Sequence, residues 1–460
     1  MKLFNAGGKI LFSRVGQVMA NAAVVMVVAN VLGPEKQGHF SLTVAVAMLV
    51  AALLGGGMGL ASVPPLRQGK VKFTRMFTAQ VIWMTAMVAV IGVVAWLTNF
   101  GRFATGLNHH LGWSLGMGYI AAVAAVGMLG FETFSYDLLA RGRLVVGAAV
   151  NGVRALGHLA LVGVLALLGA LTFERTVGAF ALAQFGGAMA MLVILLRELK
   201  RSYRDVVLPA EAPALPLHKD DVPDDLNERS YFGLIVYNLR HGWLGQISAV
   251  AYFLLLRLDQ GLLEHFRGST EVGIYSVAVY LGEMLWLLPG ALTPLLVHSS
   301  AGNSSDPERD RTAARALRLG TLVTLLAGLP LLFLIDPVLS VFAGGQYVQA
   351  GPAFKALLPG IVIFAPGAVL AGDFIGRGKP HWNTQASGLT VLVNVVVGVQ
   401  LIPEYGALGA AWSSTIAYAC GSFVMLARFR RVTKMSLRGL VLGQHQRMIV
   451  DRKEGGSEND

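Results

Sequence analysis

Long apolar blocks separated by short polar segments run through the whole chain. The blocks lack the one-sided periodicity of surface helices, and each is long enough to cross a membrane, because ~20 residues at ~1.5 Å rise span a ~30 Å hydrocarbon core. Twelve such spans are predicted: 10–32, 40–63, 77–97, 113–136, 145–169, 176–196, 232–257, 272–296, 317–335, 355–376, 382–402 and 406–427. The pattern therefore predicts an all-α, polytopic membrane protein.

The basic residues are distributed unevenly between the segments that join these spans. Of the 37 Lys and Arg, 28 lie in or at the edge of one alternating set: the N-terminus, 64–76, 137–144, 197–231, 297–316, 377–381 and the segment from 428. The opposite set holds five: Lys36, Arg102, Arg175, Arg267 and Lys355. Cytoplasmic loops carry the excess of Lys and Arg, so both termini are predicted to be cytoplasmic. The first span is too long for a signal peptide and lacks a small-residue cleavage site, so it is interpreted as an anchor.

Two sequence motifs recur in the same order. Asp137–Arg143 (DLLARGR) is matched 236 positions later by Asp373–Lys379 (DFIGRGK), and Gly33-x4-Gly38 is matched 235 positions later by Gly268-x4-Gly273. Six spans in each copy is an even number, so both copies enter the membrane in the same direction and form a parallel repeat. We expect two six-helix lobes, a linker rich in Pro and Asp, and a basic to polar tail, both cytoplasmic, in this order: 1–204, 205–231, 232–427 and 428–460.

Composition narrows the classes of function. Hydrophobic residues make up 55% of the chain and charged residues only 14%, where a soluble domain carries about 25% charged residues. The net charge of +11 does not indicate nucleic acid, because the charges flank the apolar blocks. One cysteine, Cys420, excludes an internal disulfide. The chain contains no H-E-x-x-H, no C-x-x-C and no Gly-rich phosphate loop, so we expect no metal, no cofactor and no enzyme.

Ionisable residues at membrane depth are costly, so each is a candidate for function. Asn151, Arg154 and His158 recur at i, i+3 and i+7, which places them on one helical face. Arg154 lies about 15 Å into its span, and Glu132 on the preceding span is its expected partner. Two interpretations stay open, a structural ion pair and a cationic lining for a diphosphate or sugar.

Span 232–257 carries Arg240 and His241. Arg240 is expected to be the principal anion contact, since a guanidinium group can hold phosphate oxygens bidentately, and Glu283 would reach it if the helices tilt suitably. Arg14, one turn inside the first span, would either extend to the interface or stand at a cavity entrance.

Two further roles are predicted for charged residues, a structural ion pair and proton coupling. Asp259 is expected to pair with Arg257 at the membrane boundary. Proton coupling through His158, His241, Glu132 or Glu283 is a further hypothesis, because these groups can titrate near neutrality at low dielectric.

The repeated loops carry Asp137 with Arg141, and Asp373 with Arg377. A carboxylate at a helix end beside basic residues predicts a staple that fixes topology, and the alternative is a cytoplasmic gate.

Three segments resemble a known family. Gly33–Ser41 (GPEKQGHFS) is similar to the first outer loop of the polysaccharide (O-antigen) flippases, which belong to the multidrug/oligosaccharidyl-lipid/polysaccharide exporter group. Arg257–Asp259 followed by Glu271–Ala278 (EVGIYSVA) resembles the signature of the seventh and eighth spans, and Ile402–Ala411 (IPEYGALGAA) that of the last. Gln260 to Phe266 departs from the family pattern, which puts the substrate in question and not the fold.

The resemblance implies two six-helix lobes around a central cavity that work by alternating access. It implies a lipid-linked oligosaccharide, usually on undecaprenyl diphosphate, moved across a bacterial cytoplasmic (inner) membrane for surface polysaccharides such as lipopolysaccharide. Expected partners are that substrate, membrane lipids, and the polysaccharide polymerase and chain-length machinery, with no nucleic acid. The alternatives are a cation-coupled drug or metabolite antiporter with the same two lobes, and a membrane glycosyltransferase or polymerase, which would need a large outer loop.

Overall fold

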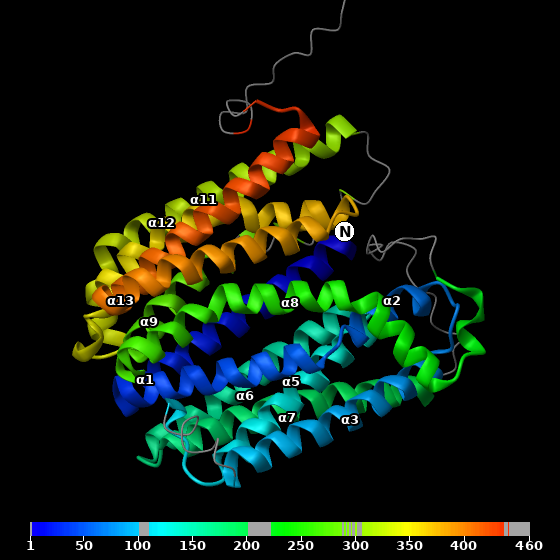
Figure 1. The fold of residues 1–460 in the computed structure, drawn as a ribbon, viewed down its shortest axis with the longest axis horizontal. Helices are drawn as coiled ribbons and strands as arrows, with labels where there is room; N and C mark the ends of the chain where they lie inside the picture. The colour runs from blue at the N-terminus through cyan, green and yellow to red at the C-terminus, as the bar shows by residue number, and fades with distance from the viewer. Residues whose placement is uncertain are drawn as a thin grey trace, which may run out of the picture.

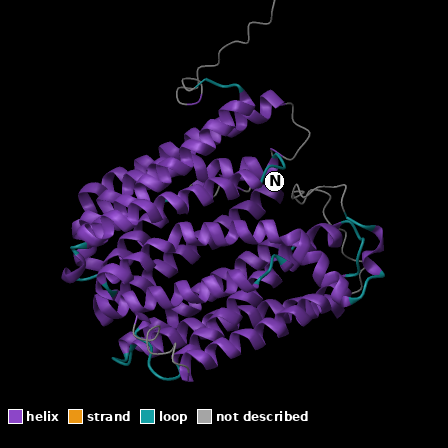
Figure 2. Ribbon diagram, viewed as in Figure 1, coloured by secondary structure: helices purple, strands orange, loops and turns teal. Residues whose placement is uncertain are grey.

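The computed structural model describes residues 2–100, 110–200, 222–287, 306–436 and positions 289, 290, 292, 293, 296, 300 and 440. Helices account for all the regular structure of this part of the chain, as Figures 1 and 2 show. They are α1 (Lys2–Leu54), α2 (Met58–Arg67), α3 (Phe73–Phe100), α5 (Met117–Ala140), α6 (Leu144–Leu167), α7 (Phe173–Lys200), α8 (Tyr231–Arg267), α9 (Ser269–Met284), α11 (Asp306–Phe342), α12 (Ala350–Gly376) and α13 (His381–Thr433), with short 3-10 turns at Asp224–Asn227 and Gly345–Tyr347. The all-α prediction is confirmed. The predicted linker up to residue 221 and the tail from residue 441 lie outside the described residues.

Every predicted span overlaps one of these helices. Within the described residues, eight helical stretches are long and apolar enough to cross a membrane. Two of them, in α1 and α13, each overlap two predicted spans, because the chain turns at a single glycine, Gly33 or Gly406, whose backbone is not helical. Twelve crossings remain a prediction, which these turns support.

A turn interrupts two of the predicted spans, 40–63 and 272–296. Span 40–63 is interrupted, because α1 ends at Leu54 and Gly56 and Gly57 adopt positive φ angles of 59° and 68° before α2 begins. Span 272–296 is also interrupted, because α9 ends at Met284 and a turn at Leu285 and Trp286 follows, after which the described positions of the span are helical again. The glycine run explains the first break, because positive φ is open to glycine and costly for other residues.

The first repeated motif ends a helix in the same way in both copies. After α5, Gly142 has φ 72° and the N–H of Arg143 donates to the carbonyl of Leu138 over 2.8 Å. After α12, Gly378 has φ 71° and the equivalent bond has the same length. This is the Schellman pattern, in which a glycine in the left-handed region lets the last carbonyls find donors.

The second repeated motif brings the two copies into contact. Gly33 and Gly268 share an extended backbone with positive φ, 79° and 86°. On the helices that follow, a Cβ at Gly38 or at Gly273 would overlap a backbone carbonyl one turn earlier on the other helix. The contact is therefore reciprocal, as expected where two copies of a parallel repeat meet about a shared axis.

The helices form two groups on either side of a central layer. Figure 1 shows α3, α5, α6 and α7 on one side, α11, α12 and α13 on the other, and α1, α8 and α9 between them. The Gly38–Gly273 contact lies in this layer, beside two buried hydrogen bonds: Gln37 donates to Ser276 (3.3 Å) and Ser41 to Gln260 (2.8 Å). One apolar core joins residues of α1, α8, α9, α12 and α13 here. The two sides are thus sealed at the end predicted to face outward.

The orientation of this seal in the membrane gives a prediction. We expect a reporter fused after Lys70 to lie inside the cell and one fused after Arg267 to lie outside, because the loop around Lys70 is basic and the α8–α9 turn is not. Alkaline phosphatase, which is active only outside, and green fluorescent protein, which is fluorescent only inside, measure this. Phosphatase activity at Lys70 together with fluorescence at Arg267 would reverse the topology.

Candidate functional site

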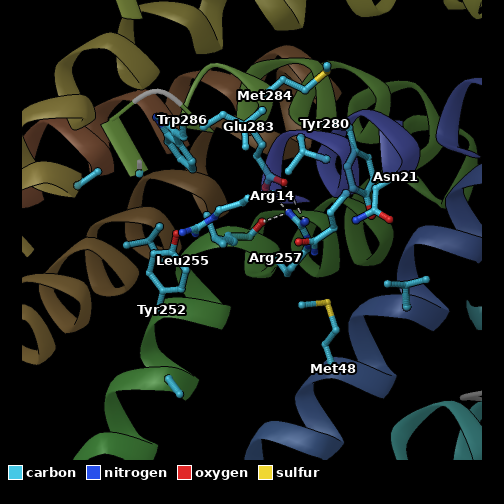
Figure 3. A pocket seen from close by; sticks show the side chains of 18 of the residues that line it. Arg14, Asn21, Met48, Tyr252, Leu255, Arg257, Tyr280, Glu283, Met284 and Trp286 are labelled. Carbon is cyan, nitrogen blue, oxygen red and sulfur yellow. Dashed lines mark hydrogen bonds and ion pairs between the residues drawn. The ribbon is translucent and has the colours of Figure 1, made fainter. Parts of the chain in front are cut away.

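A cavity of about 930 Å³ lies between the two sides of the molecule. Its wall is built by residues of α1, α5, α6, α7, α8, α9, α12 and α13 and of the segment that follows α9, so both predicted lobes contribute. Figure 3 shows part of the wall, with Arg257 and Glu283 pointing toward each other and Arg14, Tyr280 and Tyr252 around them. The volume is in the range of sites that enclose a small ligand or part of a larger one.

The cavity lies on the other side of the Gly38–Gly273 seal from the end predicted to face outward, and polar residues line it toward the opposite end. The lining from α13 includes Asn383, Ser387 and Thr390 in its first turns, at the end where α12 finishes. The Gly38–Gly273 seal lies at the opposite end, and Arg14 in the wall is exposed. The structure therefore corresponds to a cavity that opens toward the predicted cytoplasmic side.

Four charged side chains line the cavity: Arg14, Arg154, Arg257 and Glu283. Three positive charges against one negative leave an excess of two positive charges among these four side chains. Glu283 forms an ion pair with Arg257. Neither Arg14 nor Arg154 has a carboxylate partner within the described part of the chain. Guanidinium groups free of carboxylates favour the binding of an anion.

Arg154 is held by polar and aromatic contacts. Its Nη2 donates to Asn151 (2.7 Å), whose own amide donates to Gln17 of α1 (2.7 Å), and the guanidinium lies 4.7 Å from the Phe131 ring centre. The predicted ion pair with Glu132 is wrong. Successive residues of α5 point in different directions, and the one turned toward Arg154 is Phe131.

Of the other predicted residues of α6 and α5, His158 lines the cavity, and Asn151 and Glu132 do not. His158 lines the cavity and packs between the rings of Phe40 and Phe180, at 6.5 and 5.5 Å. Asn151 orients Arg154 and is not itself part of the wall. Glu132 borders a separate small pocket of about 30 Å³.

Arg240 and His241 lie outside the wall of the cavity. Both are exposed, and His241 Nδ1 is 2.7 Å from the carbonyl oxygen of Tyr237. The predicted pairing of Glu283 with Arg240 is wrong, because Glu283 faces Arg257, more than four turns further along α8.

Asp259 does not line the cavity, and both oxygens of its carboxylate accept hydrogen bonds. Its carboxylate accepts hydrogen bonds from Tyr275 (2.6 Å) and Ser414 (2.8 Å), which joins α8 to α9 and α13. The predicted pairing with Arg257 is wrong. Residues two apart on a helix point in different directions, so the two side chains cannot share a face.

In the second repeated loop, Asp373 and Arg377 form a buried network. Asp373 accepts from Arg377 Nε and from Ser300, both at 2.6 Å, and Arg377 Nη2 donates to Asp310 of α11 (2.7 Å). The contacts join α12 to its neighbour on the same side of the cavity, which favours the staple interpretation over a gate between lobes.

The first copy of this loop uses different partners. The buried Asp137 accepts from Gln80 of α3 (3.1 Å), and the guanidinium of Arg141 lies 4.4 Å from the Phe73 ring centre. These contacts again stay within one side of the cavity.

Two polar residues of the cavity wall were not predicted, although their spacing in the sequence indicates a shared helical face. Gln17 and Asn21 follow Arg14 at i+3 and i+7 and line the cavity with it. This is the spacing that marked Asn151, Arg154 and His158, so the polar face of the first span could have been found in the same way.

Comparison with known proteins gives relatives in sequence and in structure. No known protein-family model matches the chain. It is 24% identical over 196 residues to the probable flippase AglR of Haloferax volcanii, covering 40% of this chain and 39% of that protein. It is 23% identical over 159 residues to the capsular polysaccharide biosynthesis protein CapF of Staphylococcus aureus, covering 34% and 40%. The chain thus aligns with about two fifths of the length of these relatives.

Two solved structures are similar over nearly the whole chain. The lipid II flippase MurJ in an inward closed conformation superposes with a TM-score of 0.69 at 13% identity, covering 96% of this chain and 92% of MurJ. An inward-facing multidrug resistance MATE transporter of the MOP superfamily gives a TM-score of 0.64 at 16% identity, covering 91% and 96%. The chain is a multi-pass membrane protein with the two-lobe fold of MurJ and of the MATE transporter, and its sequence resembles those of a probable flippase and a capsular polysaccharide biosynthesis protein.

Proposed function

We propose that this protein is a flippase that moves a lipid-linked oligosaccharide across a bacterial cytoplasmic membrane by alternating access. The observation that carries the proposal is the cavity, which opens toward the predicted cytoplasmic side and holds an excess of two positive charges. Each phosphate of a carrier diphosphate keeps one ionised oxygen at neutral pH, so an undecaprenyl-diphosphate carrier would match this excess.

The chemistry of the wall suits both parts of such a substrate. Arg14 and Arg154 replace the water that a diphosphate loses at membrane depth, where an unpaired charge is costly. Neutral polar side chains such as Asn383, Ser387 and Thr390 offer hydroxyl and amide groups to sugar hydroxyls.

The two lobes, 1–204 and 232–427, would move against each other about the central layer, with 205–231 as the linker between them. The transported unit would serve surface polysaccharide biosynthesis, with a polymerase and chain-length machinery as partners downstream. Neither a metal, nor a cofactor, nor a catalytic residue is needed for this activity.

A cation-coupled drug or metabolite antiporter is the second candidate, because MATE transporters share the fold. The charge of the cavity separates the two functions. A cationic drug would be repelled by a wall with two excess positive charges, whereas an anionic lipid headgroup is attracted. The relatives named as flippases support the first candidate.

Substitutions in the cavity test the proposal. We expect Arg14→Gln and Arg154→Gln each to lower surface-glycan display about ten- to hundredfold, because each removes a charge-assisted contact to phosphate. Display is measured with lectin or antibody in a host strain that lacks the native gene, at matched amounts of protein in the membrane. Arg431→Gln removes an exposed arginine at the end of α13 and should leave display unchanged. Wild-type display in both cavity variants would contradict the proposed function.

A further inference from the structure

A third arginine of the cavity is covered by a carboxylate. Nη1 and Nη2 of Arg257 on α8 donate to the two oxygens of Glu283 on α9, over 2.5 and 3.1 Å, and both residues line the cavity. We propose that Glu283 occupies the place of a phosphate on Arg257 and is exchanged for the carrier diphosphate when the substrate enters. The inference rests on the proposed function and adds a binding residue and a release step to it.

The positions of the two side chains place the carboxylate on the cavity side. Glu283 is 23% exposed and Arg257 only 8%, so the carboxylate is the more accessible partner of a pair whose side chains point toward each other (Figure 3). Arg257 is fixed from behind, because Nη1 also donates to the carbonyl of Leu256 (2.9 Å) and the group lies 5.3 Å from the Tyr280 ring centre. Its forked edge therefore points at whatever takes the place of the carboxylate, and phosphate fits this fork as carboxylate does.

Apart from its ion pair with Arg257, the carboxylate of Glu283 is weakly held. Within the described residues its carboxylate has no hydrogen-bond partner other than Arg257, whereas the nearby Asp259 accepts from two hydroxyls and a backbone N–H. Glu283 is also the penultimate residue of α9, which ends at Met284. A negative charge near the C-terminal end of a helix is disfavoured by the helix dipole. Both features lower the cost of moving Glu283 off the guanidinium.

The exchange gives the transporter a way to bind and then release its substrate. With Glu283 displaced, Arg257 joins Arg14 and Arg154 as a third guanidinium facing the anion. The displaced carboxylate remains beside the bound diphosphate and repels it, so the substrate is not held too tightly to leave. Removing the negative charge of Glu283 should therefore strengthen binding and slow transport at the same time.

The test uses the full-length protein in lipid nanodiscs and two probes, farnesyl diphosphate in the lipid phase and inorganic pyrophosphate in solution. Glu283→Gln keeps an acceptor oxygen for Arg257 and removes the charge. We expect it to lower the Kd for both probes about tenfold while surface-glycan display falls. Glu404→Gln removes the same charge at an exposed position of α13 and should leave both quantities unchanged. Melting temperatures report whether each variant is folded.

A second variant keeps the test independent of folding. Glu283→Gln combined with Arg257→Gln should lose the gain in affinity, because the uncovered guanidinium is gone. Equal affinity of wild type and Glu283→Gln, with weaker binding in Arg14→Gln, would overturn the exchange and leave the proposed function standing. A gain for pyrophosphate alone would also overturn it, since a lipid-borne headgroup would not reach Arg257. Absence of binding of both probes to wild type and to every variant would overturn both the exchange and the proposed function.

Discussion

Replacing Gly273 with Ala is expected to abolish transport, because the end of the molecule predicted to face outward could then no longer close. A methyl group at Gly273 would overlap the backbone carbonyl of Pro34, and one at Gly38 would overlap that of Ser269. Backbone on both sides of the contact cannot turn aside as a flexible side chain can. Alanine favours a helix over glycine by about 0.5–1 kcal/mol, so any loss comes from the contact between helices and not from the helices themselves.

Two measurements detect the loss of closure and of transport. Surface-glycan display should fall to background in Gly273→Ala and in Gly38→Ala at normal amounts of protein in the membrane. In a background in which Cys420 is replaced by Ser, a cysteine at the buried position Ser276 should become accessible to a membrane-impermeant thiol reagent added outside. A cycle that cannot close its outer side cannot return to receive substrate, which is why the expected loss is complete.

Gly261 provides a matched control. It lies on α8, and a Cβ there would meet no atom within 4 Å, so Gly261→Ala should retain display and keep the cysteine at position 276 protected. Normal display in Gly273→Ala with that cysteine still protected would show that the glycine contact is not needed for closure.

Replacing Arg377 with Ala is expected to cause the largest loss of stability among single substitutions of charged residues. Arg377 is 4% exposed and pairs with Asp373, which is fully buried, and with Asp310, which is 14% exposed. Its removal leaves carboxylates without a counter-charge, and breaking a buried pair from one side costs about 3–5 kcal/mol. The network joins α12 to α11, so the loss should loosen one end of the α11–α13 group.

Thermal unfolding of the detergent-solubilised protein measures this loss. Arg431→Ala, on the exposed end of α13, should leave the melting temperature unchanged. Arg377→Lys should recover only part of the stability, because an ammonium group cannot donate to two carboxylates in the fixed fork of a guanidinium. An unchanged melting temperature in Arg377→Ala would mean that the buried network does not stabilise the fold.

Local chemistry made much of the fold predictable. The twelve apolar spans all overlap helices, because span length and apolar composition are properties of each segment alone. The repeated Asp-x-x-x-Arg-Gly motif predicted equivalent loops, and both copies end their helices with a glycine near φ 70°. The break at Gly55–Gly57 was missed, although three consecutive glycines are a signal for a turn.

Helical periodicity made part of the candidate site predictable as well. Arg154 and His158 share a face in the sequence and share the cavity wall in the structure. For Arg14 two alternatives were open, extension to the interface and a cavity entrance, and it lies exposed in the wall. In these cases one helix decides which residues share a face, so no knowledge of its neighbours is required.

The sequence by itself determined the helices, their paired turns and the polar face of the fifth span. Only the tertiary structure decided that Glu283 faces Arg257 rather than Arg240, that Asp259 turns away from Arg257, and that Arg240 lies outside the cavity. The reason is physical. Which side chains meet across two helices depends on how far each helix is rotated and tilted, and packing against helices distant in the sequence sets both.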